Sequence, residues 1–162
     1  MRKFGLRMEL PEGKLAGYYA QIVKALAETV SLYDRDKELI VVSSAEEQSD
    51  VALTLAKFKI TWEPIPLWLL PEDARIGPQA SDYGFTSKFG NHYLYADITE
   101  IFRLSETQKA DAETAPAILQ FDEHIIASYE LPEAVYYAVE SHLKETIEGI
   151  AERYGVSVSF LE

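Results

Sequence analysis

The chain has 162 residues, no cysteine, and 27 acidic against 15 basic side chains, which gives a net charge of -12. Without cysteine it can build neither a disulfide scaffold nor a thiolate nucleophile nor a zinc ribbon. The excess of acid argues against nucleic acid as a partner, because that binding depends on Lys and Arg displacing condensed counterions. A hydrophobic fraction of 48% is typical of a globular chain, and the length predicts a single domain over 1–162.

No stretch of the sequence reaches the roughly 18 apolar residues that span a bilayer. The basic start of the chain is followed at once by Glu9 and Glu12 rather than by the apolar core of a signal peptide. We therefore expect a cytoplasmic protein with no membrane partner. Residues 103–162 carry twelve acidic and four basic side chains, so the last third should be a negative pole that favours encounter with basic proteins.

The first elements form a strand-helix-strand pattern. Phe4, Leu6 and Met8 alternate with other residues as in a half-buried strand. Apolar residues at spacings of three and four then predict a long helix over about 12–33, and the apolar run 39–42 predicts a strand buried on both faces. A helix of this length would let the two strands run parallel in one sheet.

The end of the chain shows the same plan. A strand near 125–129 is followed by apolar spacing that predicts a second long helix over about 132–154, and by an alternating strand over 156–160. The tetrapeptide Glu-Leu-Pro-Glu occurs at 9–12 and again at 130–133. An old duplication and a coincidence between two helices that start alike both explain this match.

The middle of the chain gives mixed signals. Ser44 to Glu47 has the form of a capping box, which would start a helix over about 45–56. Alternating apolar residues favour a strand over about 51–62 instead, and we predict the strand, with a bulge. Four prolines between residues 64 and 78 argue against a long central strand there. The polar stretch 105–115 predicts an exposed loop.

The clearest local pattern predicts an antiparallel hairpin, 83–89 paired with 92–98 across a two-residue turn. In that register one face is core-like and the other, with Tyr93 and Tyr95, is wet or a contact surface. The predicted fold is therefore α+β: a mixed sheet with two long helices packed on it, a strand-helix-strand unit at each end, and the hairpin between. The uncovered sheet face would allow a homodimer.

Motifs for catalysis are missing from the sequence, which has no Gly-rich phosphate loop, no nucleophile elbow and no His-x-x-x-His pair. Of the imidazoles of His92, His124 and His142, the last two could share a site. Asp122 would be a second ligand beside His124, but the sequence indicates no third ligand for a metal. We predict no catalytic residue, no metal and no cofactor, and a binding protein more readily than an enzyme.

Two functions follow from these observations. The first is a non-enzymatic acidic protein that docks a basic protein partner, as an inhibitor or immunity-type protein does. The second is a domain or enzyme that binds an anionic or planar small molecule between residues 62–78 and the hairpin 83–98. The alternative is that the tryptophans fill the core and the arginines are ordinary surface residues. The candidate contacts are aromatic or cationic side chains: Trp62, Trp68, Arg75, Lys88, Tyr93, Tyr95 and Arg103.

Overall fold

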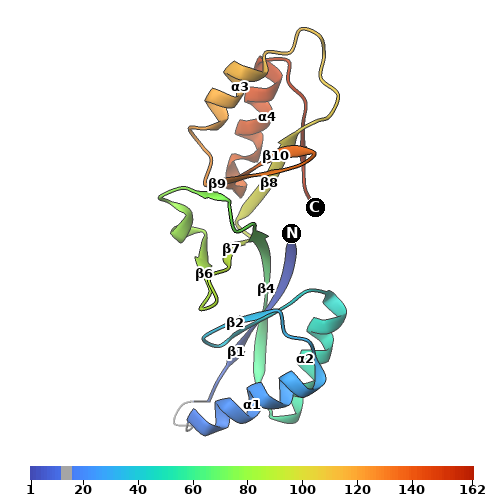
Figure 1. Ribbon diagram of the computed structural model, residues 1–162, viewed down its shortest axis with the longest axis vertical. Coiled ribbons are helices and arrows are strands. Elements are labelled where there is room, and N and C mark those ends of the chain that lie inside the picture. The colour runs from blue at the N-terminus through green and yellow to red at the C-terminus, as the bar shows by residue number, and fades with distance from the viewer. Residues whose placement is uncertain (12–15) are drawn as a thin grey trace. The chain divides into compact units, whose positions relative to one another are not determined.

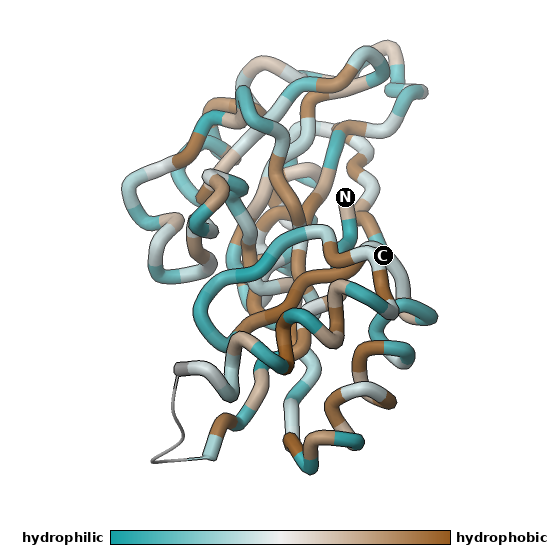
Figure 2. Tube along the Cα trace, turned by 60° about the horizontal axis from the view of Figure 1, so that its bottom comes forward, coloured by the Kyte–Doolittle hydropathy of each residue, from teal (hydrophilic) through white to brown (hydrophobic). Residues whose placement is uncertain are grey.

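The computed structural model describes residues 1–11 and 16–162. The described chain is α+β, with two sheets and four α-helices (Figure 1), and this class agrees with the sequence prediction. Stretches of hydrophobic residues alternate with hydrophilic ones along the trace (Figure 2). None of the described helices has both the length and the apolar character needed to cross a membrane.

The chain divides into two compact units. Unit 1 consists of Met1–Leu69 and Thr86–Tyr93, and unit 2 consists of Leu70–Phe85 and Leu94–Glu162. Each unit contains two of the helices. The expectation of a single domain stays a prediction.

The six-stranded sheet contains the strands of unit 1 together with β6 and β7. Its two helices, α1 (Ala16–Thr29) and α2 (Ala45–Lys57), cover one face, and Leu6, Ile22 and Leu55 lie in the core between the layers with no exposed surface. The strand order is β2 (Asp34–Asp36), β3 (Leu39–Val42), β1 (Arg2–Glu9), β4 (Thr61–Leu70), β7 (His92–Tyr95) and β6 (Gly84–Thr86).

The predicted parallel arrangement of β1 and β3 is wrong. These strands pair antiparallel, with Phe4 opposite Val42. The reason is the short edge strand β2, which lies between the predicted helix and the predicted strand and was not expected. The chain leaves α1 into β2, and a tight turn at Lys37, whose φ is 53°, reverses it into β3.

In unit 1 one predicted helix has other bounds and one predicted strand is mostly a helix. The helix expected over 12–33 ends at Thr29, and its first four residues lie outside the described chain. The strand favoured over 51–62 is instead the helix α2, which begins at the capping box: the backbone N–H of Glu47 donates to the Ser44 hydroxyl at 3.1 Å. The alternating apolar residues misled because Leu53 is exposed on this helix, whereas Leu55 is buried.

Strand β4 runs through two prolines that were expected to forbid it. The backbone N–H of Leu69 donates to the carbonyl of Met1 at 2.7 Å, so the odd-numbered N–H groups of β4 point towards β1. Pro64 and Pro66 are even-numbered. Their missing N–H groups therefore lie on the other edge and cost β1 no hydrogen bond.

The hairpin of β6 and β7 exists as predicted, but its register differs. The backbone N–H of Ser87 donates to the carbonyl of Asn91 at 2.8 Å, and that of Tyr95 donates to Tyr83 at 2.8 Å. The turn therefore holds three residues, 88–90, and Gly90 adopts a φ of 89°. Three-residue hairpin loops favour glycine at this left-handed position.

This register moves the hairpin tyrosines to the other face. Tyr95 now lies beside Phe85, with ring centres 5.7 Å apart, and Tyr93 is only 1% exposed. The predicted wet face carrying Tyr93 is therefore wrong. An odd shift in register places every residue of one strand against the opposite set of partners.

Unit 2 contains a five-stranded sheet whose defined pairs are all antiparallel. Helices α3 (Thr114–Phe121) and α4 (Lys144–Arg153) pack on it around Phe102, Phe121 and Tyr137. Two short 3-10 helices cover Ala80–Asp82 and Ser141–Leu143. The strand order is β11 (Val158–Phe160), β8 (Thr99–Leu104), β10 (Ala134–Glu140), β9 (Ala127–Leu131) and β5 (Arg75–Ile76).

The second long helix, expected over 132–154, is wrong. Its first half is strand β10, which pairs with β9 across a turn at Pro132 and Glu133, and the α-helix begins only at Lys144. Val135, Tyr136, Tyr137 and Val139 are β-branched or aromatic, and such residues prefer a pleated sheet. The tetrapeptide at 130–133 thus covers the end of β9 and the hairpin turn, and no helix starts there. A helix start common to both segments therefore does not explain its match with 9–12.

Candidate functional site

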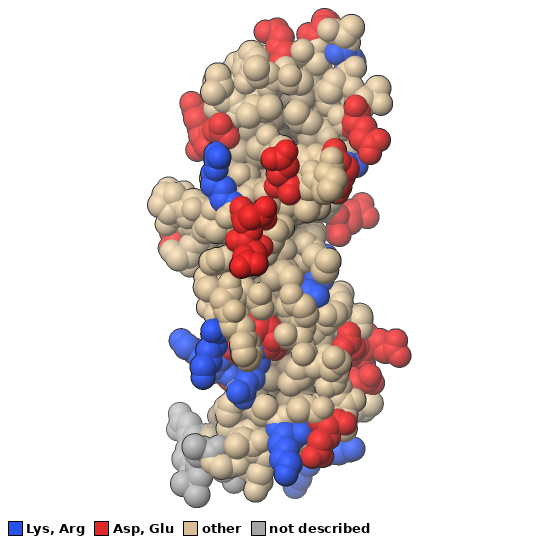
Figure 3. Space-filling view, viewed as in Figure 1, with Lys and Arg blue, Asp and Glu red and all other residues tan. Residues whose placement is uncertain are grey.

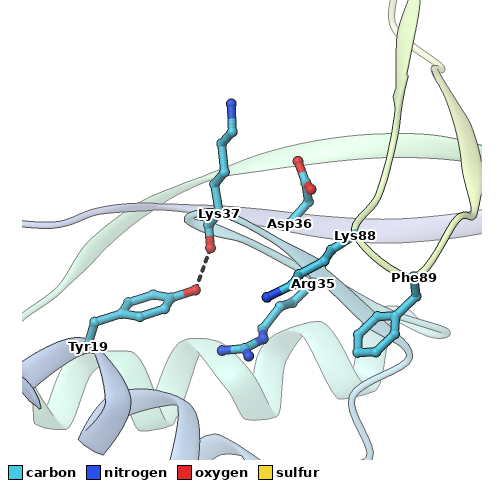
Figure 4. A pocket seen from close by; sticks show the side chains of 6 residues that line it. All are labelled: Tyr19, Arg35, Asp36, Lys37, Lys88 and Phe89. Carbon is cyan, nitrogen blue, oxygen red and sulfur yellow. Dashed lines mark hydrogen bonds between the residues drawn. The ribbon is translucent and has the colours of Figure 1, made fainter. Parts of the chain in front are cut away.

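A pocket of about 560 Å³ opens in unit 1 beside the edge strand β2. Three segments that are distant in sequence supply its walls: α1, the β2-β3 hairpin and the β6-β7 loop. Its volume lies in the range of small-molecule sites, about 300–1,000 Å³. We call it the basic pocket, and its lining residues are Tyr19, Arg35, Asp36, Lys37, Lys88 and Phe89 (Figure 4).

Two cationic side chains converge in this pocket. In Figure 4, Arg35 and Lys88 point into the space between the rings of Tyr19 and Phe89, whereas Asp36 and Lys37 extend in the opposite direction. Strand geometry explains why Arg35 and Asp36 diverge, because successive residues of β2 point to opposite faces of the sheet, while Lys37 follows the strand in the turn. Arg35 pairs with Ile40 of β3, which belongs to the core under the helices, so Arg35 faces the α1 side.

No carboxylate of the described residues forms an ion pair with Arg35 or with Lys88. The acidic lining residue, Asp36, points away from both in Figure 4. Two uncompensated cations facing one hollow attract an anion, and a guanidinium in particular offers a planar fork of donors to oxyanions.

A buried carboxylate holds the two arms of the pocket together. Asp34, 3% exposed, accepts hydrogen bonds from the Tyr93 hydroxyl at 2.7 Å and from the Asn91 side-chain amide at 2.8 Å, both on Oδ2. Its Oδ1 accepts from the backbone N–H of Arg35 at 2.8 Å. Asp34 therefore ties β2, which carries Arg35, to the segment that carries Lys88 and Phe89.

The hydrogen bonds decide the protonation of this carboxylate. Burial disfavours its charge, but the bonds from Ser87, Asn91, Tyr93 and the backbone of Arg35 outweigh burial and lower the pKa of Asp34 below its ordinary value. Burial first, and Asp34 second, raise the pKa of Tyr93. Asp34 is thus an anion and Tyr93 a proton donor across the neutral pH range.

The remaining walls are also fixed. The Tyr19 hydroxyl donates to the backbone carbonyl of Lys37, which attaches α1 to the β2-β3 turn. At the β6-β7 loop, the N–H of Gly90 donates to the Ser87 carbonyl at 2.9 Å. Lys88 and Phe89 therefore sit on an ordered backbone while their side chains remain exposed.

The net charge of the protein lies entirely in unit 2. Unit 2 holds 17 acidic and 5 basic residues, whereas unit 1 holds 10 of each. On the face drawn in Figure 3, acidic groups dominate unit 2, and basic groups gather near the tip of the β2-β3 hairpin. A hollow of about 410 Å³ in unit 2, which we call the acidic hollow, is lined by Asp73, Asp122 and Glu130 and by the basic residue Arg75.

The predicted contact residues fall into both units. Lys88 lines the basic pocket, and Arg75 is exposed in the acidic hollow. Trp68 is 4% exposed and belongs to the buried hydrophobic residues, with the Arg2 guanidinium 5.0 Å from its ring centre. Trp62, Tyr95 and Arg103 are half-buried, and Tyr93 is the buried donor to Asp34.

Sequence reasoning missed most of the basic pocket. Of its lining residues only Lys88 was a candidate contact: Tyr19 falls in the helix predicted over 12–33 and Phe89 in the hairpin strand predicted over 83–89, whereas Arg35 and Lys37 lie between the predicted elements. The alternation of acid and base over 34–37 was the available signal. Its meaning depends on which side of an edge strand each residue faces.

Two of the three histidines have polar partners nearby in sequence. His92 is hydrogen-bonded to the Thr86 hydroxyl at 2.8 Å, and His142 Nδ1 lies 3.0 Å from Glu140. Across residues 1–11 and 16–162, no three His, Asp or Glu side chains are placed to hold a metal ion.

The site and the fold define an α+β protein with a basic pocket in one unit and a strongly acidic second unit. No protein-family model matches the chain, and the comparison with curated proteins gives no match either.

Proposed function

We propose that unit 1 binds a small anionic ligand in the basic pocket. The observation that carries the proposal is the convergence of Arg35 and Lys88, free of any ion pair among the described residues, between two aromatic rings. Unit 1 as a whole is neutral, so the attraction is local to the pocket. Such a site suits a compact oxyanion better than a nucleic acid, which needs an extended basic surface.

Neutralising the two cations should abolish most of this binding. The probe is ribose 5-phosphate, a small phosphorylated sugar. We expect Arg35→Gln and Lys88→Gln each to weaken its binding at least about tenfold, because a hydrogen bond to a charged group is worth about 1.5–3 kcal/mol. Isothermal titration calorimetry at low salt measures the dissociation constants.

The matched control is Lys57→Gln, which removes the same charge from an exposed position at the end of α2. It should leave the affinity nearly unchanged. Equal losses of affinity in all three variants would mean that the effect is general electrostatics. If millimolar ribose 5-phosphate did not bind to the unaltered protein, the proposal would be rejected.

We also propose that unit 2 docks a basic protein partner, in the manner of an inhibitor or an immunity-type protein. The supporting observation is the placement of the whole net charge of -12 in this unit. A like-signed field of this kind accelerates encounter with a partner of opposite charge.

The rate of association with a Lys-rich peptide tests this second proposal. It should fall steeply as salt rises from low to physiological ionic strength, because screening shortens the range of the field. The triple variant Glu145→Gln, Glu148→Gln, Glu152→Gln removes exposed acids of α4 and should slow association further. The matched triple Glu28→Gln, Glu46→Gln, Asp50→Asn in unit 1 should not, and equal slowing by both sets would contradict the assignment to unit 2.

A further inference from the structure

The basic pocket has an aromatic ring at its rim that the protein core does not use. Phe89 is 74% exposed at the tip of the β6-β7 loop. Tyr19, on the other wall, packs partly against the core of unit 1, whereas Phe89 is absent from that core. Nor does the Phe89 ring pair with another aromatic ring of the described residues.

This exposed ring stands on an ordered backbone. The N–H of Asn91 donates to the Ser87 hydroxyl at 3.3 Å, beside the backbone bonds that close the three-residue turn. Ser87 is 5% exposed, so the base of the loop is buried while its tip is not. A platform fixed before binding loses little conformational entropy when a ligand covers it.

The positions of the charges relative to this ring define the ligand further. Arg35 and Lys88 point into the space that Phe89 borders (Figure 4), so an anion held by them lies near the Phe89 ring. Lys88 and Phe89 are adjacent residues of one turn, which makes the two contacts part of one site.

We propose, on the basis of the anion-binding function, that the ligand is a nucleoside monophosphate: a phosphate joined through a sugar to a planar base. The phosphate accepts hydrogen bonds from Arg35 and Lys88. The base stacks on Phe89, a contact that any nucleobase can make and that is worth about 1–3 kcal/mol. Phe89 determines the preference for an aromatic ligand, and the two cations determine the preference for an anion.

Three probes separate these contributions in calorimetric titrations: adenosine monophosphate, ribose 5-phosphate and adenosine. We expect adenosine monophosphate to bind at least about fivefold more tightly than ribose 5-phosphate, which corresponds to the lower end of the stacking range. Adenosine, which lacks the phosphate, should bind more weakly than either.

Substitution of the ring locates the preference. Phe89→Leu should bring adenosine monophosphate to the affinity of ribose 5-phosphate while leaving the latter unchanged, and that unchanged value also shows that the variant is folded. Phe89→Tyr should retain the preference, because it keeps the stacking surface. Arg35→Gln should weaken the binding of adenosine monophosphate and of ribose 5-phosphate by the same factor.

The outcomes distinguish this inference from the function on which it rests. If both phosphates bind the unaltered protein equally, or if their difference survives Phe89→Leu, the nucleotide assignment is overturned and anion binding stands. If neither phosphate binds, the anion-binding proposal fails and the nucleotide assignment fails with it.

Discussion

Replacing Asp34 by asparagine is expected to lower the free energy of unfolding by about 2–4 kcal/mol, since a buried charged acceptor loses its hydrogen bonds. Asparagine would place an N–H₂ donor or a weaker carbonyl against the Tyr93 hydroxyl and the Asn91 amide, which both donate to the carboxylate now. Urea unfolding followed by circular dichroism measures the loss. Affinity for ribose 5-phosphate should fall as well, because Asp34 ties the strand of Arg35 to the segment of Lys88.

Asp36→Asn is the matched control for this effect. Asp36 lies two residues along the same strand and lines the basic pocket, but it is only half-buried. Its replacement should change stability by less than about 0.5 kcal/mol, as surface substitutions usually do, and should strengthen anion binding slightly by removing a negative charge. Equal destabilisation by both variants would contradict a special role for Asp34.

The same carboxylate predicts a pH dependence. Because the pKa of Asp34 is lowered in the folded protein, the unfolded chain takes up this proton first as the pH falls. The contribution of Asp34 to the free energy of unfolding is complete above the ordinary carboxyl pKa of about 3.9. It is lost as the pH falls further, through the pKa that Asp34 has in the folded protein. Asp34→Asn should lack this component of acid destabilisation, and an identical acid profile for both proteins would contradict the account.

Phe102→Ala should have the largest effect in unit 2, a loss of about 3–5 kcal/mol for a buried aromatic side chain. Phe102 has no exposed surface, and its ring centre lies 5.2 Å from Phe121, 5.3 Å from Tyr137 and 5.4 Å from Phe160. One ring thus joins strand β8 to helix α3 and to strands β10 and β11. Thermal and urea unfolding both report the change.

Leu119→Ala provides the comparison within the same unit. Leu119 lies on α3 but is 69% exposed, so its truncation leaves no cavity and should cost less than about 0.5 kcal/mol. A small effect of Phe102→Ala would mean that the aromatic cluster is not the centre of this core.

The fold class and several strands could be predicted from the sequence because their patterns are local. The run 39–42 is buried on every residue as β3, and the alternation at Phe4, Leu6 and Met8 lies in β1. The helix predicted over 132–154 failed because Val135 and Val139 fit a helical spacing and a strand equally well. Pairing with β9, which no local pattern reveals, decides between them.

The candidate site was less predictable, since it depends on tertiary register. The hairpin turn has three residues instead of the predicted two, and the resulting change of register separates a wet Tyr93 from the buried donor to Asp34; the sequence is compatible with both turns. Lys88 was singled out for its charge beside aromatic residues. Its partner Arg35 is 53 positions away in the chain and reaches the pocket through the pairing of an edge strand.

Titration of isotopically labelled protein with ribose 5-phosphate, followed by nuclear magnetic resonance, tests the existence of the basic pocket most directly. We predict saturable shifts centred on the backbone N–H groups of β2, on the β6-β7 loop and on the side chain of Arg35, and their disappearance in Lys88→Gln. Shifts that are scattered over exposed lysines elsewhere, or none at all near β2, would contradict the account.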